Sequence, residues 1–139
     1  MKEEIKNKMF KKALAVQKNA YVPYSDFPLG AAVLTADGSI YTGVNIENAS
    51  FGLTNCAERS AIFSAVSQGK RKIEALLIVS STEEPVTPCG ACRQVIKEFA
   101  AGDIEVIMMT KKGKELTMTS KELLPGAFSE QAMEKNNEL

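Results

Sequence analysis

Two short cysteine motifs constrain this chain more than any other feature. The first is Cys56-Ala57-Glu58 and the second is Pro88-Cys89-Gly90-Ala91-Cys92, and together they contain every cysteine of the sequence. The sequence has no histidine, so the residue that most often serves as metal ligand and as general base is missing. Any transition-metal site in this chain would therefore have to be built from these three sulfurs.

The number of sulfur donors favours a catalytic zinc site over a structural one. Structural zinc normally takes four protein ligands, whereas catalytic zinc takes three and keeps the fourth position for water or substrate. Three cysteines with no fourth cysteine and no histidine fit the second pattern. We therefore expect one Zn²⁺ per subunit, held by Cys56, Cys89 and Cys92.

Glu58 is the candidate proton carrier beside this metal. It follows Cys56 by two residues, a spacing that does not place it on the same helical face as a second ligand. It can instead lie over the open position, where a general acid and base must sit to move a proton from water to substrate. Zinc deaminases carry this pattern, Cys or His-x-Glu followed by Pro-Cys-x-x-Cys, with a glutamate that is not a ligand.

Arg59 is the candidate source of compensating charge. Three thiolates around Zn²⁺ leave a net negative centre, so positive charge from helix N-termini and from Arg59 is expected nearby. We expect Arg59 to donate to one or two of the metal-bound sulfurs, with a solvated surface arginine as the alternative. A redox pair, half of a structural zinc site or cysteines that fill the core are further alternatives. None of these explains Glu58 or Pro88.

Hydrophobic periodicity and turn signals divide the chain into nine elements. A helix is expected near residues 2–19, ending before Pro23, and Thr54 or Asn55 is expected to cap the second helix. Gly102-Asp103 is expected to form a turn before the fourth strand. The remaining elements are strands at 27–35 and 40–46, a helix at 56–68, a strand at 73–80, a helix at 89–100, strands at 105–109 and 116–118, and a brief helix at 120–125.

This order predicts an α/β fold, a three-layer α/β/α domain around a five-stranded mixed sheet. The length of 139 residues fits a single domain spanning 1–139, with 128–139 as a C-terminal tail. Lysine plus arginine and aspartate plus glutamate balance at 17 each, so no basic field indicates a nucleic-acid or membrane partner. The charged N-terminus and an odd number of thiols favour the cytoplasm.

Five stretches resemble the small homotetrameric cytidine deaminases of pyrimidine salvage, and the resemblance runs from about Tyr21 to Phe128. The zinc motif alone would indicate only the wider deaminase superfamily, whereas Asn45-Ile46-Glu47-Asn48-Ala49 is more specific. The other stretches are Tyr-Val-Pro-Tyr-Ser-Asp-Phe-Pro-Leu-Gly-Ala-Ala, Cys-Ala-Glu-Arg-Ser-Ala, Pro-Cys-Gly-Ala-Cys-Arg-Gln-Val and Glu-Leu-Leu-Pro-Gly-Ala-Phe. The resemblance implies a nucleoside substrate and a homotetramer whose active sites are shared between subunits.

The resemblance also implies roles for residues outside the zinc motif. Asn45 and Glu47 would hold the ribose hydroxyls, for which an amide and a carboxylate are suited. Phe27 would pack against the pyrimidine and Phe128 would reach the base, in a neighbouring subunit's site. Without the resemblance, these would be a solvated strand end and core or tail anchors. Backbone groups at Ala57 and Pro88 would read the pyrimidine edge, and Ala49 and Phe51 would border a neighbour's site, with Phe51 standing where many members have tyrosine.

The implied reaction is hydrolysis at C4 of cytosine, which gives uridine or deoxyuridine and ammonia while Glu58 carries the protons. A deaminase of a modified cytosine nucleoside such as blasticidin S is the nearest alternative, and Asn45-Ile46-Glu47-Asn48 argues for an ordinary ribose instead. A deaminase acting on RNA or DNA lacks support because no basic face is apparent. A non-enzymatic zinc or redox module is the alternative from another class. The sequence does not rank cytidine against deoxycytidine.

Overall fold

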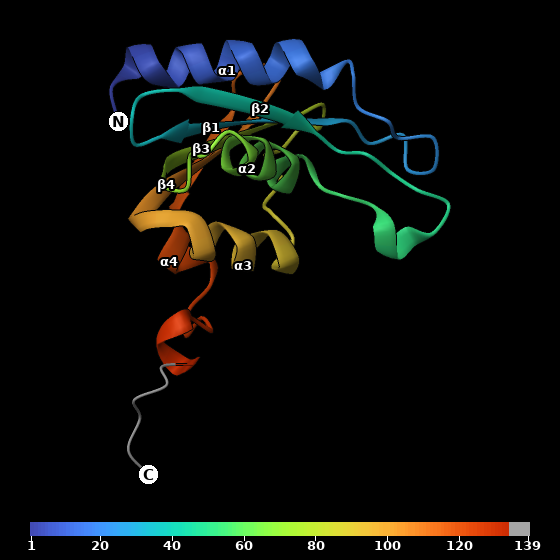
Figure 1. Cartoon of the computed structure of the whole chain (residues 1–139). Coiled ribbons are helices and arrows are strands. Elements are labelled where there is room, and N and C mark those ends of the chain that lie inside the picture. Colours follow the sequence, from blue (N-terminus) through green and yellow to red (C-terminus); the bar gives the residue numbers. More distant parts are fainter. Residues whose placement is uncertain (134–139) are drawn as a thin grey trace.

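A five-stranded mixed sheet with helices on both faces forms the body of the protein in the computed structural model, which describes residues 1–133 (Figure 1). The strand order is β2-β1-β3-β4-β5, and only the β3–β4 pair is parallel. The elements are α1 (Glu3–Gln17), β1 (Leu29–Thr35), β2 (Ile40–Val44), η1 (Phe51–Leu53), α2 (Ala57–Ser67), β3 (Ile73–Ser80), α3 (Gly90–Phe99), β4 (Ala100–Thr110), β5 (Glu115–Thr119), α4 (Ser120–Leu123) and η2 (Glu130–Met133).

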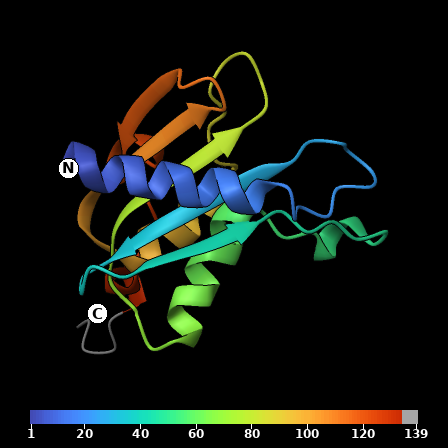
Figure 2. The ribbon, with the colours of Figure 1, turned by 90° about the horizontal axis from the view of Figure 1, so that it is seen from above.

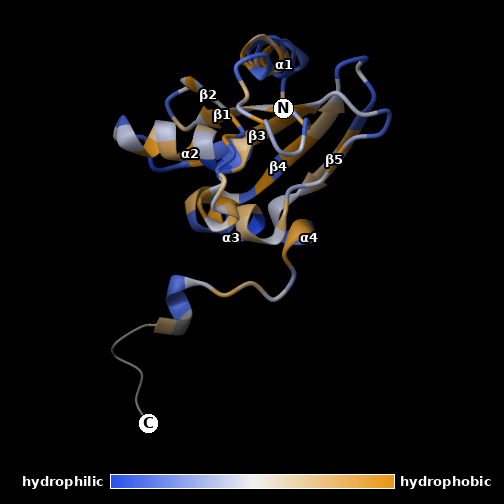
Figure 3. Ribbon diagram, turned by 90° about the vertical axis from the view of Figure 1, so that its right-hand side faces the viewer, coloured by the Kyte–Doolittle hydropathy of each residue, from blue (hydrophilic) through white to orange (hydrophobic). Residues whose placement is uncertain are grey.

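Two apolar cores separate the layers. The central strand β3 is buried at every position but one, as its continuous apolar run predicts for a strand covered on both faces. Helix α1 packs Met9 and Ala13 onto one face of the sheet, and in Figure 2 it crosses above the strands. Helices α2, α3 and α4 cover the opposite face (Figure 3). The predicted three-layer α/β/α fold is thus confirmed.

Strand direction brings the two cysteine motifs to one edge of the sheet. Strands β2 and β3 are each antiparallel to β1 and therefore point the same way. The chain leaves the carboxyl end of β2 toward α2 and the carboxyl end of β3 toward α3. Both helices consequently begin at the same edge, which places their N-termini close together. The topology alone thus explains why motifs far apart in the sequence meet.

Some predicted element boundaries were wrong. Strand β4 begins at Ala100, directly after α3. Gly102 adopts φ 84° within the strand, and the register against β3 shifts there. A glycine in such a bulge looks like a turn in the sequence. Strand β1 begins at Leu29 instead of residue 27. Cys56 occupies the N-cap position of α2 in place of Thr54 or Asn55, because the backbone of Asn55 pairs with Ile46.

Gly43 lies where β2 and α2 are in close contact, which gives a test of the packing. A Cβ at this position would lie 2.3 Å from the backbone nitrogen of Ala61, and backbone cannot move aside as a flexible side chain would. We expect Gly43→Ala to lower the free energy of unfolding by more than about 2 kcal/mol. Urea denaturation measures the change relative to wild type. Wild-type stability of Gly43→Ala would contradict this packing.

Within the part of the chain that the structure describes, none of the helices has the length and apolar character needed to cross a membrane.

Candidate active site

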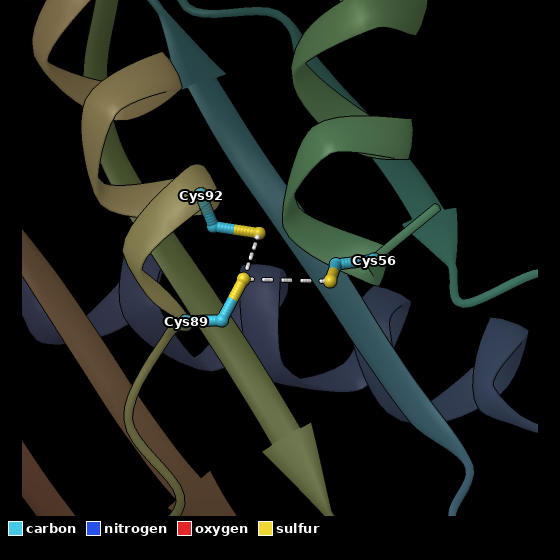
Figure 4. A group of neighbouring side chains, drawn as sticks. All are labelled: Cys56, Cys89 and Cys92. Carbon is cyan, nitrogen blue, oxygen red and sulfur yellow. Dashed lines mark hydrogen bonds between the residues drawn. The ribbon is translucent and has the colours of Figure 1, made fainter. Parts of the chain in front are cut away.

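Three sulfur atoms meet where α2 and α3 begin. Cys56 and Cys89 are the N-cap residues of these helices, and neither side chain caps its own helix through a hydrogen bond. The Cys89 Sγ atom lies 3.7 Å from Cys56 Sγ and 3.5 Å from Cys92 Sγ, and all three atoms lie within 4.8 Å of one another (Figure 4). The sulfurs therefore face a common point instead of the helix backbone.

This cluster fits a single zinc ion. Three thiolates on a tetrahedral Zn²⁺, with Zn–S distances of about 2.3 Å, would lie about 3.8 Å apart, close to the separations observed here. Contacts with Cys92 and with the Arg59 guanidinium lower the pKa of the Cys56 thiol to about 5, whereas the contact with Cys56 raises the pKa of Cys92. Ionisation of Cys56 thus opposes ionisation of Cys92, and a cation between the sulfurs would remove this conflict, which matches the chemistry of the donor set.

Glu58 projects into the protein beside the sulfurs and has an unpaired oxygen. The side chain belongs to the first turn of α2 and is 3% exposed, and its Oε1 atom makes no hydrogen bond among the described residues. Burial raises the pKa of Glu58 to about 7, and negative charge on Cys56 acts in the same direction. Buried polar atoms are nearly always paired, so this orphan oxygen points to a group that pairs with a bound ligand. A pKa near neutrality also suits a general acid and base.

Arg59 places positive charge beside the cluster. Its Nη2 atom lies 3.4 Å from Cys56 Sγ, and this contact raises the pKa of the guanidinium. The Nε atom of Arg59 is buried and lacks a hydrogen-bond partner among residues 1–133. The guanidinium therefore stabilises negative charge on Cys56, in the position where the sequence predicted a donor to a sulfur.

Asn45 and Glu47 hold the segment that carries Phe27. The Asn45 side chain accepts from the Leu29 backbone N–H at 2.9 Å and donates to the Phe27 carbonyl at 2.8 Å. The Glu47 carboxylate accepts from the backbone N–H groups of Tyr24 and Ser25 at 3.0 and 3.1 Å and from the Ser25 hydroxyl. One amide proton of Asn45 and one lone pair of the Glu47 carboxylate remain available.

Of the other predicted contact residues, Ala57 is fully buried at the start of α2 and Pro88 is buried next to Cys89, whereas the remaining three are exposed. Ala49 is exposed, Phe51 is 75% exposed and Phe128 is 60% exposed. The Phe51 ring contacts Tyr24 edge-to-face with centroids 6.0 Å apart. A hollow of about 350 Å³ opens between them, lined by Tyr24, Ser25, Glu47, Phe51 and Thr54.

Two kinds of contact were missed by sequence reasoning. The first is the contact of Ser25 with Glu47, for which the sequence offers no signal beyond an exposed hydroxyl in a turn. The second involves Arg93 and Gln94, whose side chains bind backbone carbonyls far along the chain. Their place directly after Cys92 was the available signal.

Comparison with known proteins gives a consistent result. Residues 3–109 match the family model described as "Cytidine and deoxycytidylate deaminase zinc-binding region". The chain is 52% identical over 124 residues to the cytidine deaminase of Sporosarcina psychrophila, covering 89% of this chain and 91% of that protein. It is 35% identical over 105 residues to the blasticidin-S deaminase of Bacillus cereus, covering 70% and 74%. The crystal structure of cytidine deaminase from Burkholderia pseudomallei is similar with a TM-score of 0.85 at 42% identity, covering 92% of this chain and 100% of that one.

Proposed function

Because the chain belongs to the family of cytidine and deoxycytidylate deaminases, we propose that it hydrolyses cytidine and deoxycytidine to uridine and deoxyuridine with release of ammonia. The observation that carries this proposal is the unpaired oxygen of Glu58, buried beside three sulfurs that fit one zinc ion. A structural zinc site or a redox pair has no use for such a carboxyl group. The greater identity to a cytidine deaminase than to a blasticidin-S deaminase favours the ordinary nucleoside.

The protein's own residues divide the work at this site. Zinc held by Cys56, Cys89 and Cys92 would supply a Lewis acid that makes water a nucleophile near neutral pH. Glu58 takes one proton of the attacking water and delivers it to N3 of cytosine. It then takes the second proton from the hydroxyl group now on C4 and gives it to the amine, which leaves as ammonia while the C4 carbonyl forms. Its raised pKa lets the carboxyl group both accept and donate a proton near neutral pH. Burial excludes competing bulk water from this exchange.

We assign recognition of the nucleoside to the segment that Asn45 and Glu47 hold. The free amide proton of Asn45 and the remaining lone pair of Glu47 suit the ribose hydroxyls. Phe27, which is 39% exposed, would cover the pyrimidine ring. Backbone groups at Ala57 and Pro88 would read its polar edge. The contacts with the ribose and with the pyrimidine ring are linked, because Asn45 and Glu47 also fix the backbone of residues 24–29, which carries Phe27.

A homotetramer with shared active sites is part of the proposal. Several large apolar side chains are exposed around η1, where a second subunit would cover them: Tyr24, Ile46, Phe51 and Leu53 are 54%, 49%, 75% and 70% exposed. Ala49, Phe51 and Phe128 would then border a neighbour's site. Sedimentation at equilibrium tests the assembly, with four chains expected and a monomer contradicting it.

Three reduced cysteines fit a cytoplasmic location, which we also propose.

A nucleoside panel tests the proposed function. Loss of ultraviolet absorbance is expected with cytidine and deoxycytidine, and a zinc chelator is expected to abolish it. Cytosine, cytidine monophosphate and blasticidin S serve as comparison substrates for the base alone, the phosphorylated form and the alternative function. Turnover of blasticidin S in preference to cytidine, or full activity after zinc has been removed, would overturn the assignment.

Arg59→Ala tests the role of positive charge beside the sulfurs. Loss of the guanidinium leaves the negative centre uncompensated, so we expect zinc affinity or kcat to fall by about tenfold or more. Zinc content by atomic emission and steady-state kinetics measure the two effects. Arg71→Ala is the matched control because Arg71 is exposed and outside the site. Unchanged zinc and unchanged turnover in Arg59→Ala would show that the contact with Cys56 is incidental.

A further inference from the structure

The Arg93 and Gln94 side chains connect the start of α3 to the residues after β5 through backbone carbonyls. The Arg93 Nε atom donates to the Pro88 carbonyl at 2.7 Å, and its Nη1 atom donates to the Leu123 carbonyl at 2.9 Å. The Gln94 amide nitrogen donates to the Phe128 carbonyl at 3.0 Å. Among the described residues, no other side-chain hydrogen bond joins residues 88–94 to the residues that follow β5.

The first of these bonds acts on the peptide unit that carries Cys89. The Pro88 carbonyl and the Cys89 nitrogen belong to one planar unit that ends at the Cys89 Cα, so fixing the oxygen helps to fix where that Cα lies. Cys89 has no capping bond of its own and is exposed. Arg93 lies one helical turn after it, with its backbone N–H bonded to the Cys89 carbonyl, and is therefore on the correct face to reach back to Pro88.

The second bond connects this unit to a rigid point. Leu123 is 3% exposed and belongs to the core beneath the sheet. It is the last residue of α4, and a carbonyl at a helix C-terminus lacks an intrahelical partner. A charged guanidinium suits that carbonyl, and its planar fork allows one side chain to serve two acceptors at once. The two hydrogen bonds of Arg93 thereby hold the Cys89 region in place relative to the core.

We propose that Arg93 is a positioning residue that fixes the Pro88–Cys89 corner of the metal site against the core, and that Gln94 likewise positions the segment carrying Phe128. The inference rests on the proposed function, because it concerns zinc retention and substrate binding at that site. Arg93 acts on the metal through Cys89, and Gln94 acts on the substrate through Phe128. Neither side chain is assigned a contact with the reacting atoms.

The two residues give different expected results. In Arg93→Ala, release of zinc to a chromogenic chelator is expected to be about tenfold faster than in wild type. Arg93→Lys is expected to show a smaller acceleration, because one ammonium group can reach Pro88 or Leu123 but has no fork to join them. Gln94→Ala is expected to release zinc at the wild-type rate, with KM for cytidine raised several-fold and kcat within about twofold of wild type.

Controls separate positioning from general destabilisation. Ile107→Val removes one methylene group from the core on the α1 side of the sheet, lowering stability without touching the site. Zinc release from Ile107→Val as fast as from Arg93→Ala would overturn the proposal, as would release from Arg93→Ala within twofold of wild type. If Arg93→Ala does not fold, Arg93→Lys decides by the same comparison. The wild-type enzyme tests the proposed function separately, because its zinc content and uridine production do not depend on any variant.

Discussion

Glu58→Gln is expected to lower kcat for cytidine by about a thousandfold while the protein keeps its full content of zinc. General acid–base catalysis by a placed side chain contributes about 10²–10⁴ in rate, and this carboxyl group is assigned every proton transfer of the reaction. Glutamine keeps the size of the side chain and a carbonyl oxygen but cannot accept or release a proton at neutral pH. The sulfur atoms are unchanged, so metal binding has no reason to weaken.

The measurement pairs steady-state kinetics with zinc analysis on the same preparation. Glu98→Gln is the matched control, because Glu98 is an exposed glutamate of α3 and its substitution should leave both quantities unchanged. Turnover of Glu58→Gln near the wild-type rate would show that another group carries the proton. Loss of zinc from Glu58→Gln would indicate that the carboxylate is itself a ligand, which would also fill the position kept for water.

Cys92→Ala is expected to remove both zinc and activity. Cys92 is fully buried and supplies one of only three donors, so its loss leaves two sulfurs and no residue of the same chemistry to replace it. Two ligands do not hold Zn²⁺ against a chelator at neutral pH. Zinc content is expected below about a tenth of the wild-type value, with deamination below detection.

Ala91→Ser provides the control, because Ala91 is exposed and lies next to Cys92 in α3. This variant changes the first turn of α3 by a similar amount but keeps all three sulfurs, so zinc and activity should remain. A stoichiometric zinc content in Cys92→Ala would place the metal elsewhere. Full activity in Cys92→Ala with no zinc would refute metal-dependent deamination.

The metal cluster could be predicted from the sequence because composition left little choice. With three cysteines and no histidine, the sulfur and nitrogen donors of a metal site could come from only one set of side chains, and the helix starts around Cys56 and Cys89 followed from local signals. The central strand β3 could be predicted equally well, because a continuous apolar run such as Ala75-Leu76-Leu77-Ile78-Val79 is typical of a strand covered on both faces. Both predictions rest on local sequence and on the count of donors.

Contacts between distant segments could not be read in this way. The bond from Arg93 to the Leu123 carbonyl joins residues 30 positions apart, and no periodicity shows which carbonyl a guanidinium reaches. The Asn45 and Glu47 side chains bind residues 24–29 because the end of β2 passes beside that segment, a result of topology. Gly102 was misread for a related reason: a positive φ serves a turn and a bulge equally well.

X-ray absorption at the zinc edge of the purified protein tests the central claim most directly, because it counts the atoms bound to the metal and distinguishes sulfur from lighter elements. The account predicts three sulfurs near 2.3 Å and one oxygen or nitrogen near 2.0 Å, with the lighter atom altered when a nucleoside inhibitor binds. A shell of three sulfurs closed by a fourth protein ligand that no inhibitor changes, or purified protein without zinc, would contradict it.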